Sequence, residues 1–189
     1  MRYHRSTGLV GALVFAVLFA IPLNGQTARV RVSARGTVEA VVDGVSITIE
    51  YGRPTKRGRV IWGVLVPWGK WWAPGADESA SIVTSGPLDI ATLHMPAGTH
   101  TIYAMPDANT FLLIINNQTG QFHTVYHPDR DLGRVPTVMT KLDEPVELMT
   151  FVVTPHPSGG GSLALRWDDR EYAVNIAAPA GVRADGSVR

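Results

Sequence analysis

The stretch TVEAVVDGVSITIEY, residues 37–51, indicates the fold class of this 189-residue chain. From Val45 to Tyr51, apolar side chains alternate with serine, threonine and glutamate, a pattern that is typical of a half-buried β-strand. Residues 37–42 form another strand-like run, and Asp43-Gly44 stands between the two. Asp-Gly between two such runs is a strong hairpin signal because both residues tolerate positive φ. The sequence therefore predicts an antiparallel hairpin here.

The same strand-and-turn pattern continues towards the C-terminus. Alternation marks residues 163–167 and 172–176, and the turn-forming residues 168–170 between these two runs predict a second hairpin. Residues 110–116 are almost continuously apolar, as expected of a strand that is buried on both faces. Further strand candidates are residues 80–84, 88–93, 99–105, 122–126 and 146–154.

The periodicity and the turn residues together predict the fold class. No stretch shows a capped apolar stripe of helical period, and proline and glycine interrupt the chain at short intervals. We therefore expect an all-β fold, a single-domain antiparallel β-sandwich that is jelly-roll-like or a partly closed barrel. Few or no helices are expected after the N-terminal segment.

The N-terminal segment has the pattern of a secretory signal peptide. Arg2 and Arg5 precede an apolar run, residues 8–23, which is shorter than the about 20 residues of a membrane span. We expect residues 1–28 to be the signal peptide, 29–178 the β-sandwich domain and 179–189 a disordered tail. The expected location is exported, either periplasmic or extracellular, and an uncleaved N-terminal membrane anchor is the alternative.

Composition restricts the function classes. The chain has no cysteine, which excludes disulfides, thiolate zinc sites and thiol nucleophiles. Removing residues 1–28 would take away two arginines and no acid, so the formal charge would change from +1 to −1. That charge does not favour a nucleic-acid partner, and no second apolar run is long enough to span a membrane. No cofactor motif occurs, and the sequence leaves the oligomeric state open.

One stretch concentrates positive charge and tryptophan. Residues 51–76 contain no acidic residue, yet they hold five lysines and arginines and four of the chain's five tryptophans. Guanidinium groups bind carboxylate or phosphate in bidentate fashion, and flat rings stack on apolar ligand surfaces. This pattern predicts a binding or accessory module for an anionic or carbohydrate-like ligand in the cell envelope. The candidate ligand-binding residues are Arg53, Lys56, Arg59, Lys70, Trp71, Trp72 and Glu78.

Two other interpretations of these residues remain open. The tryptophans also fit a core and the arginines also fit structural ion pairs, which would make this a purely structural envelope protein. An extracytoplasmic hydrolase of glycans or peptides would use Glu78 with a second acid brought near by folding. No catalytic residue is assigned. His123 and His127 would lie about 13 Å apart on one strand, so no metal site is predicted.

Several motifs resemble those of a known family. EYGRPTKRGRVIWG (50–63) and LVPWGKWWAPGADES (65–79) are similar to the signature of a bacterial family of exported domains, domain of unknown function 2911. MPAGTHTIYAMP (95–106), LLIINNQTGQFHTVYHPDRDLGRVP (112–136) and LRWDDREYAVNI (165–176) also resemble it. The resemblance implies a secreted or periplasmic β-rich domain with no established activity. Its signature positions here are Glu50, Tyr51, Arg53, Pro54, Lys56, Gly58, Arg59, Gly63, Pro67, Gly69, Lys70, Trp72, Gly75, Ala76 and Glu78.

Overall fold

The computed structural model describes residue 1 and residues 33–181, and the latter form a β-sandwich. Ten strands and one short 3-10 helix make up this described part. In chain order they are β1 (Ala34–Val42), β2 (Val45–Arg53), β3 (Ser81–Thr84), β4 (Leu88–Ile90), β5 (Leu93–Met95), β6 (Gly98–Pro106), β7 (Phe111–Asn116), η1 (Pro128–Arg130), β8 (Asp131–Pro136), β9 (Val138–Pro155) and β10 (Gly161–Ala177).

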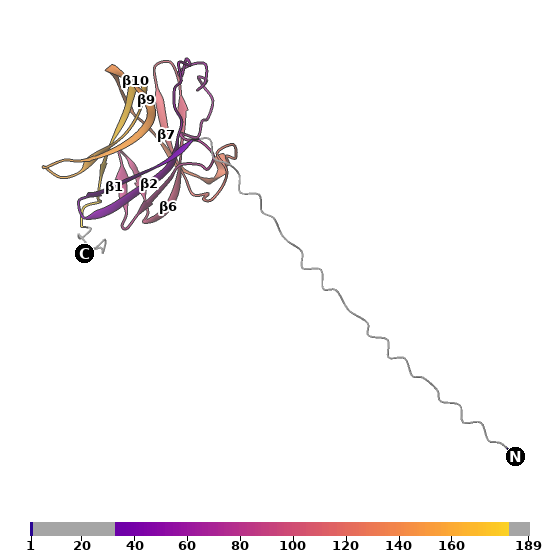
Figure 1. Ribbon diagram of the computed structural model, residues 1–189. Coiled ribbons are helices and arrows are strands. Elements are labelled where there is room, and N and C mark those ends of the chain that lie inside the picture. The colour runs from indigo at the N-terminus through magenta and orange to yellow at the C-terminus, as the bar shows by residue number, and fades with distance from the viewer. Residues whose placement is uncertain (2–32, 182–189) are drawn as a thin grey trace. The chain divides into compact units, whose positions relative to one another are not determined.

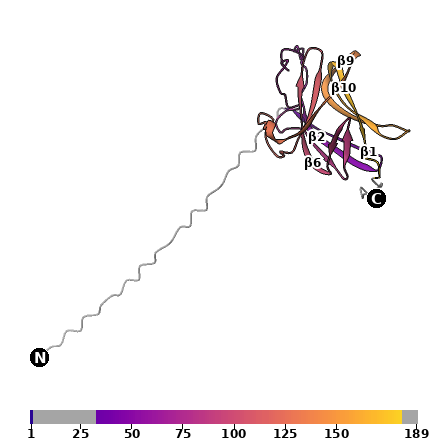
Figure 2. The ribbon, with the colours of Figure 1, turned by 180° about the vertical axis from the view of Figure 1, so that it is seen from behind.

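The strands form two antiparallel sheets. One has the order β1-β2-β3-β6-β7-β8 and the other has the order β5-β4-β10-β9. Figures 1 and 2 show β9 and β10, in orange and yellow, beside each other, whereas β1, β2 and β6 belong to the other sheet. The expected all-β sandwich is therefore confirmed, and the sheets do not close into a barrel.

The hairpin predicted from the Asp-Gly signal is present. Val42 pairs directly with Val45, and the turn residues Asp43 and Gly44 both have positive φ, 50° and 84°. These angles match the two-residue turn whose twist suits a hairpin. The Asp43 carboxylate also accepts hydrogen bonds from the backbone N–H groups of Gly160 (2.8 Å) and Ala178 (3.1 Å). The turn is thus tied to the residues that flank β10 at both ends.

Side chains from both sheets form one apolar core. In β2, Ile47 and Ile49 are buried while Ser46 and Glu50 are exposed. β7 is buried on both faces, as its apolar run predicts. Its Phe111, Leu113 and Ile115 join the main core, whereas Ile114 packs with Tyr103 and Ala73 in a second cluster on the outer face. Burial on that outer face requires a covering segment, which the loops between the strands provide.

Residues 122–126, predicted as a strand, are instead part of the long connection between β7 and β8. Only Phe122 makes a ladder-like bridge, to Glu78. Side chains bind the backbone carbonyls of this loop: Tyr103 Oη donates to Val125 (2.6 Å) and Asn116 Nδ2 donates to His127 (2.9 Å). Because these carbonyls are satisfied by side chains, the loop covers the second cluster without a strand partner.

Two other local predictions were wrong for related reasons. Residues 88–93 form two short strands, because Ala91 (φ 51°) turns the chain so that Ile90 pairs with Leu93. Residues 168–170 make no hairpin. β10 runs through them, with register shifts on either side of Asp168 (φ 54°), and continues to pair with β9. Positive φ in a strand residue is typical of a bulge, and the bulge uses the same residue types as a turn.

The predicted segments at the chain ends are largely outside the described residues. The expected signal peptide, residues 1–28, is described only at residue 1, and the expected tail, 179–189, only as far as residue 181. Within the described part of the chain, no helix is both long and apolar enough to cross a bilayer.

Candidate functional site

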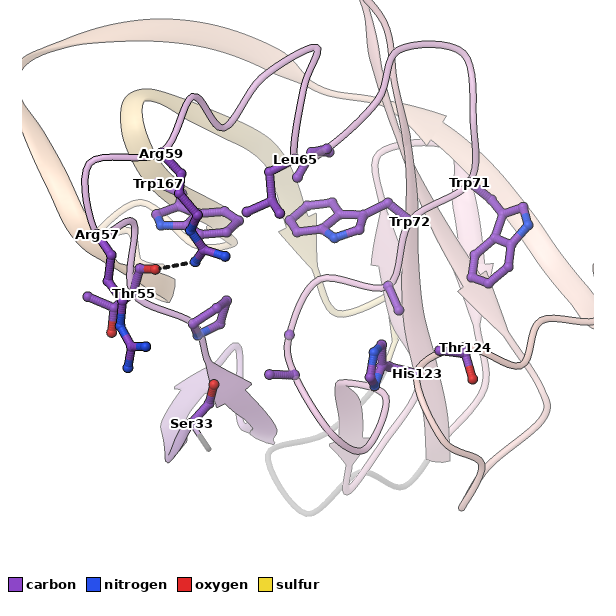
Figure 3. Close-up of a pocket in the computed structure, with 15 residues that line it drawn as sticks. Ser33, Thr55, Arg57, Arg59, Leu65, Trp71, Trp72, His123, Thr124 and Trp167 are labelled. Atoms are coloured by element: carbon purple, nitrogen blue, oxygen red, sulfur yellow. Dashed lines mark hydrogen bonds between the residues drawn. The ribbon is translucent and has the colours of Figure 1, made fainter. Parts of the chain in front are cut away.

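A cavity of about 610 Å³ lies among the segment that follows β2, the loop that precedes β3, the loop that precedes η1 and the side of β10 (Figure 3). Its lining has three kinds of side chain. Apolar groups come from Leu65, Val66, Trp71, Trp72 and Trp167, positive charge comes from Arg57 and Arg59, and hydrogen-bonding groups come from Ser33, Thr55, His123 and Thr124. None of the described residues that line it is acidic.

Two stacked indoles form the apolar side. The rings of Trp72 and Trp167 lie 6.1 Å apart, centroid to centroid, at an interplanar angle of 13°. The main chain of Trp72 is fixed by reciprocal hydrogen bonds with Ala104 of β6, at 2.7 and 2.8 Å. Trp167 is buried in the main core. Trp167 therefore supports the ring of Trp72, which is partly exposed and offers the apolar surface on which a ligand can stack.

A tight turn presents the two arginines. Arg57 and Gly58 both have positive φ, 51° and 68°, and the Arg59 N–H donates to the Lys56 carbonyl at 3.1 Å. The Arg59 guanidinium is oriented by two backbone carbonyls, that of Lys56 (2.9 Å from Nε) and that of Thr55 (2.5 Å from Nη2). Arg57 and Gly58 thus have the same pattern of positive φ as the Asp43-Gly44 turn, and this turn carries the two arginines at the edge of the cavity.

A ligand anion can pair with both guanidinium groups, although that of Arg59 already donates from Nε and Nη2 to backbone carbonyls. Among the residues that the structure describes, no carboxylate lies within ion-pair distance of Arg57 or Arg59. Glu147 does contact the turn, but its Oε1 accepts from the Arg57 backbone N–H at 2.7 Å. That bond holds the turn and leaves the guanidinium of Arg57 in the cavity lining.

His123 lies on the other side of the cavity from Arg57 and Arg59 (Figure 3). Its Nδ1 is 2.5 Å from the Asp77 carbonyl oxygen, and its backbone N–H donates to the same oxygen at 3.1 Å. A carbonyl only accepts, so Nδ1 carries a hydrogen and the neutral ring has its lone pair on Nε2. His123 can therefore accept a hydrogen bond from a ligand hydroxyl, or donate one when it is protonated.

Three of the seven predicted ligand-binding residues, Arg59, Trp71 and Trp72, line this cavity. Arg53 does not line it. Its guanidinium crosses to β9, where it donates to the Met149 carbonyl (3.2 Å) and to Thr150 Oγ1 (2.7 Å). Arg53 thus connects the two sheets.

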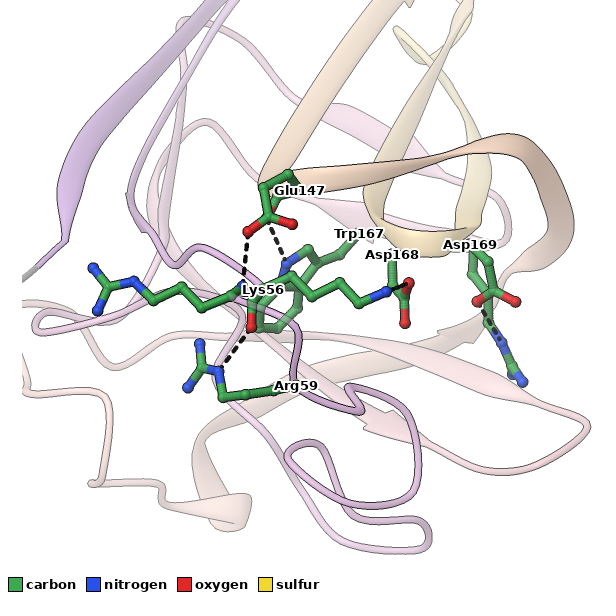
Figure 4. Close-up of polar contacts among 8 residues, drawn as sticks. Lys56, Arg59, Glu147, Trp167, Asp168 and Asp169 are labelled. Atoms are coloured by element: carbon green, nitrogen blue, oxygen red, sulfur yellow. Dashed lines mark hydrogen bonds and ion pairs between the residues drawn. The ribbon is translucent and has the colours of Figure 1, made fainter.

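The other three predicted residues also lie outside the lining. Lys56 Nζ forms an ion pair with Asp168 (Figure 4), and that hydrogen bond raises the pKa of Lys56 above its ordinary value. Lys70 is exposed on a turn. Glu78 Oε2 accepts from Arg35 Nη1 at 3.2 Å, so its carboxylate takes part in a surface contact and not in a catalytic pair within the cavity.

Sequence reasoning missed Arg57, His123 and Trp167. Arg57 belongs to the basic stretch, and Arg57-Gly58 is a turn dipeptide, a signal that could have placed it at a loop tip. The sequence placed His123 on a strand, as one of two histidines too far apart to share a metal ion. Within the described residues, no three side chains of histidine, aspartate or glutamate cluster as metal ligands would.

The loop that carries His123 also supports Trp71. The Trp71 ring lies 5.1 Å from that of Tyr126 and 6.1 Å from that of Tyr103, centroid to centroid. The Tyr126 hydroxyl donates to Asp131 Oδ2 (2.7 Å) and accepts from Arg134 Nη2 (3.0 Å). Burial, and then the bond to Asp131, raises the pKa of Tyr126 to about 12. This network fixes the ring against which Trp71 packs.

We predict that Tyr126→Phe changes the pH dependence of stability. Because the pKa of Tyr126 is higher in the folded protein than its ordinary value of 10.0, its protonated form stabilises the fold below about pH 10. That contribution is lost as pH rises towards about 12. Urea unfolding of both proteins from about pH 8 to 12 should show their difference in free energy shrinking above about pH 10. A difference that stays constant over this range would contradict the assignment.

A comparison with protein families identifies the family of the chain. Residues 33–176 match the model of a family described as "Protein of unknown function (DUF2911)". The chain belongs to the DUF2911 family. The match runs from β1 through most of β10, so it includes the arginine turn, the His123 loop and the tryptophans of the cavity. No curated protein matches the chain, and no solved structure does.

Proposed function

We propose that this DUF2911 protein is a binding module that holds a small organic acid, with a flat or sugar-like body, in the cavity. One observation carries the proposal: Arg57 and Arg59 share the cavity with the stacked indoles of Trp72 and Trp167, and none of the described residues that line it is acidic. Arginine forks bind carboxylate or phosphate, and the partly exposed indole of Trp72, which Trp167 supports, takes the apolar side of a ring. The cavity volume, about 610 Å³, is that of a small-molecule site.

The remaining lining residues fit a ligand that also carries hydroxyl groups. His123 Nε2, Thr55 and Thr124 supply hydrogen-bonding atoms around the indoles. A sugar acid combines these features, since it has an anionic group, hydroxyls and an apolar ring face. The hydrolase alternative has less support, because Glu78 lies outside the cavity and no pair of carboxylates from the described residues lines it.

The place of action is proposed from the sequence. A basic start and a short apolar run at residues 8–23 are typical of an exported protein. Export would bring this cavity into contact with ligands of the cell envelope or its surroundings.

The proposal predicts a charge-dependent affinity. Glucuronate and indole-3-acetate serve as acidic probes, and glucose and indole-3-acetamide are their neutral counterparts. We expect at least one acid to bind about 10-fold or more tightly than its neutral counterpart, because a hydrogen bond to a charged group contributes about 1.5–3 kcal/mol. Titration calorimetry, with intrinsic tryptophan fluorescence as a second readout, measures each affinity.

The double variant Arg57→Gln and Arg59→Gln should lose that preference. Lys70→Gln is the matched control, because it removes a positive charge from the same stretch but outside the cavity lining. If neither acid binds, or if the double variant binds the acid as the unmodified protein does, the proposed function is wrong.

A further inference from the structure

The exposed side chains of residues 57–71 have an unusual composition. Every exposed residue in this segment is basic, apolar or glycine: Arg57, Gly58, Arg59, Val60, Val64, Leu65, Gly69, Lys70 and Trp71. Acidic residues are missing from the whole stretch 51–76. We call these nine residues the 57–71 surface. A solvated loop normally exposes neutral polar or mixed charged groups, so this composition needs a physical reason.

The backbone of residues 60–66 is fixed so that Val60, Val64 and Leu65 are exposed. Buried Ile61, Trp62 and Val66 anchor it in the core. The N–H of Leu65 donates to the Val60 carbonyl (3.2 Å), and the N–H of Val66 donates to that of Ile61 (2.9 Å). The loop is thus a closed, hydrogen-bonded turn.

The aliphatic side chains on this turn are well exposed. The exposed fractions are 62% for Val60, 70% for Val64 and 40% for Leu65. Because Ile61, Trp62 and Val66 already occupy the core beneath this turn, the three exposed aliphatic side chains are buried only when another molecule covers them.

We propose that the 57–71 surface docks on an anionic lipid bilayer. Val60, Val64 and Leu65 would enter the interface between headgroups and acyl chains, where burying each CH₂ group gains about 0.8 kcal/mol. Arg57, Arg59 and Lys70 would lie among anionic headgroups, each adding about 1 kcal/mol near such a surface. Exposed apolar tips bordered by cations and a tryptophan are the pattern of a peripheral membrane contact.

Charge complementarity favours a bilayer as the occupant. The surface itself carries three cations and no acid. Of the acids at its border, Glu147 accepts from the Arg57 backbone N–H, and Asp169 pairs with Arg170 at 3.7 Å. Asp107 follows Pro106, whose carbonyl accepts from the Gly69 N–H at 2.8 Å. With Asp169 balanced by Arg170, the three cations face two acids, Glu147 and Asp107, so one positive charge remains in excess. A surface with excess positive charge is attracted to a negatively charged plane.

The docking proposal can be tested separately from the ligand proposal, although the two share residues. Val60, Val64 and Lys70 do not line the cavity, whereas Arg57, Arg59, Leu65 and Trp71 belong to both surfaces. Docking would place the mouth of the cavity close to the membrane surface. Variants confined to Val60 and Val64 therefore test docking without changing the residues that line the cavity.

The test is vesicle co-sedimentation of the full chain. One vesicle type is phosphatidylcholine alone and the other contains about 30% phosphatidylglycerol. We expect the unmodified protein to bind the anionic vesicles about 10-fold or more tightly, and added salt to weaken this binding. The double variant Val60→Ser and Val64→Ser should bind them at least about 10-fold more weakly.

The matched control is the double variant Val41→Ser and Val138→Ser. These valines lie outside the 57–71 surface and are exposed to 56% and 71%, close to the values of Val60 and Val64. All the proteins share the N-terminal segment, so a difference among them reports the substituted surface. The control should sediment like the unmodified protein.

Three outcomes would overturn the docking proposal. The first is equal binding of the unmodified protein to both vesicle types. The second is binding of the Val60 and Val64 variant that matches that of the unmodified protein. The third is a loss of binding in the Val41 and Val138 control as large as that in the Val60 and Val64 variant. The acid affinity of the Val60 and Val64 variant, measured without vesicles, should be unchanged. If that affinity falls while vesicle binding persists, Val60 and Val64 contribute to the ligand site and not to a docking surface, and the docking proposal is wrong.

Discussion

Trp167→Ala should lower the free energy of unfolding by about 3–5 kcal/mol, as for large-to-small substitution of a buried aromatic residue. The side chain is only 1% exposed. It stacks on Trp72, meets the edge of Trp62 at 6.4 Å between centroids, and donates from Nε1 to the Glu147 carbonyl at 3.3 Å. Removing it creates a void beside the cavity and leaves that carbonyl without the indole donor.

Urea denaturation measures this effect, with circular dichroism as the signal because the substitution removes a fluorophore. Trp71→Ala is the control. Trp71 also lines the cavity, but its side chain is 39% exposed, so its loss should cost much less stability. Equal losses for the two variants would contradict the greater contribution of buried Trp167 to the core.

Gly52→Ala should also be strongly destabilising, because the end of β2 touches the cavity wall through this glycine. A Cβ on Gly52 would lie 2.1 Å from the Ala76 carbonyl oxygen and 2.9 Å from its backbone carbon and nitrogen. The Ala76 backbone cannot change rotamer as a side chain can, so the whole segment that contains Gly75 and Ala76 must move to relieve the clash. We expect a loss of about 1–3 kcal/mol or more, as for overpacking.

The displacement should also reduce the affinity for an acidic probe, because Gly75 and Ala76 line the cavity. Gly120→Ala is the control. At Gly120 φ is 77° and no atom lies within 4 Å of the place a Cβ would take, so alanine there introduces backbone strain of about 1–2 kcal/mol without a clash. Thermal unfolding measures both losses. Because the two expected losses overlap, the affinity for the acidic probe separates the variants, since Gly120 lies outside the cavity lining and its substitution should leave that affinity unchanged. A Gly52→Ala protein as stable as the unmodified one, with the same affinity, would contradict the close approach.

Local sequence signals were enough to predict part of the fold. The β1–β2 hairpin follows from Asp43-Gly44, since both the turn and the alternation lie within residues 37–51. Asp168 carries a similar local signal, but there the chain forms a bulge and continues along β9. A turn and a bulge both place aspartate at positive φ, and only the partner strand distinguishes them.

The sequence predicted a basic, tryptophan-rich binding site, but it identified only some of the residues that line the cavity. The basic, tryptophan-rich stretch identified Arg59, Trp71 and Trp72, which do line one cavity. It could not separate Arg59 from Arg53, because their residue type is the same and only folding directs Arg53 across to β9. His123 comes from a loop, and the carbonyl that orients its ring lies 46 residues earlier in the chain. Its place depends on contacts between distant segments, which no local pattern encodes.

The most direct test of the ligand-binding account is a titration followed by the indole N–H signals in ¹H–¹⁵N NMR spectra. Trp71, Trp72 and Trp167 line the cavity, whereas Trp68 lies outside its lining and serves as the internal reference. With an acidic probe that binds, the signals of Trp71 and Trp72 should shift to saturation and that of Trp68 should stay nearly unchanged. Saturable shifts confined to Trp68, or no saturable shift for either acid, would contradict the account.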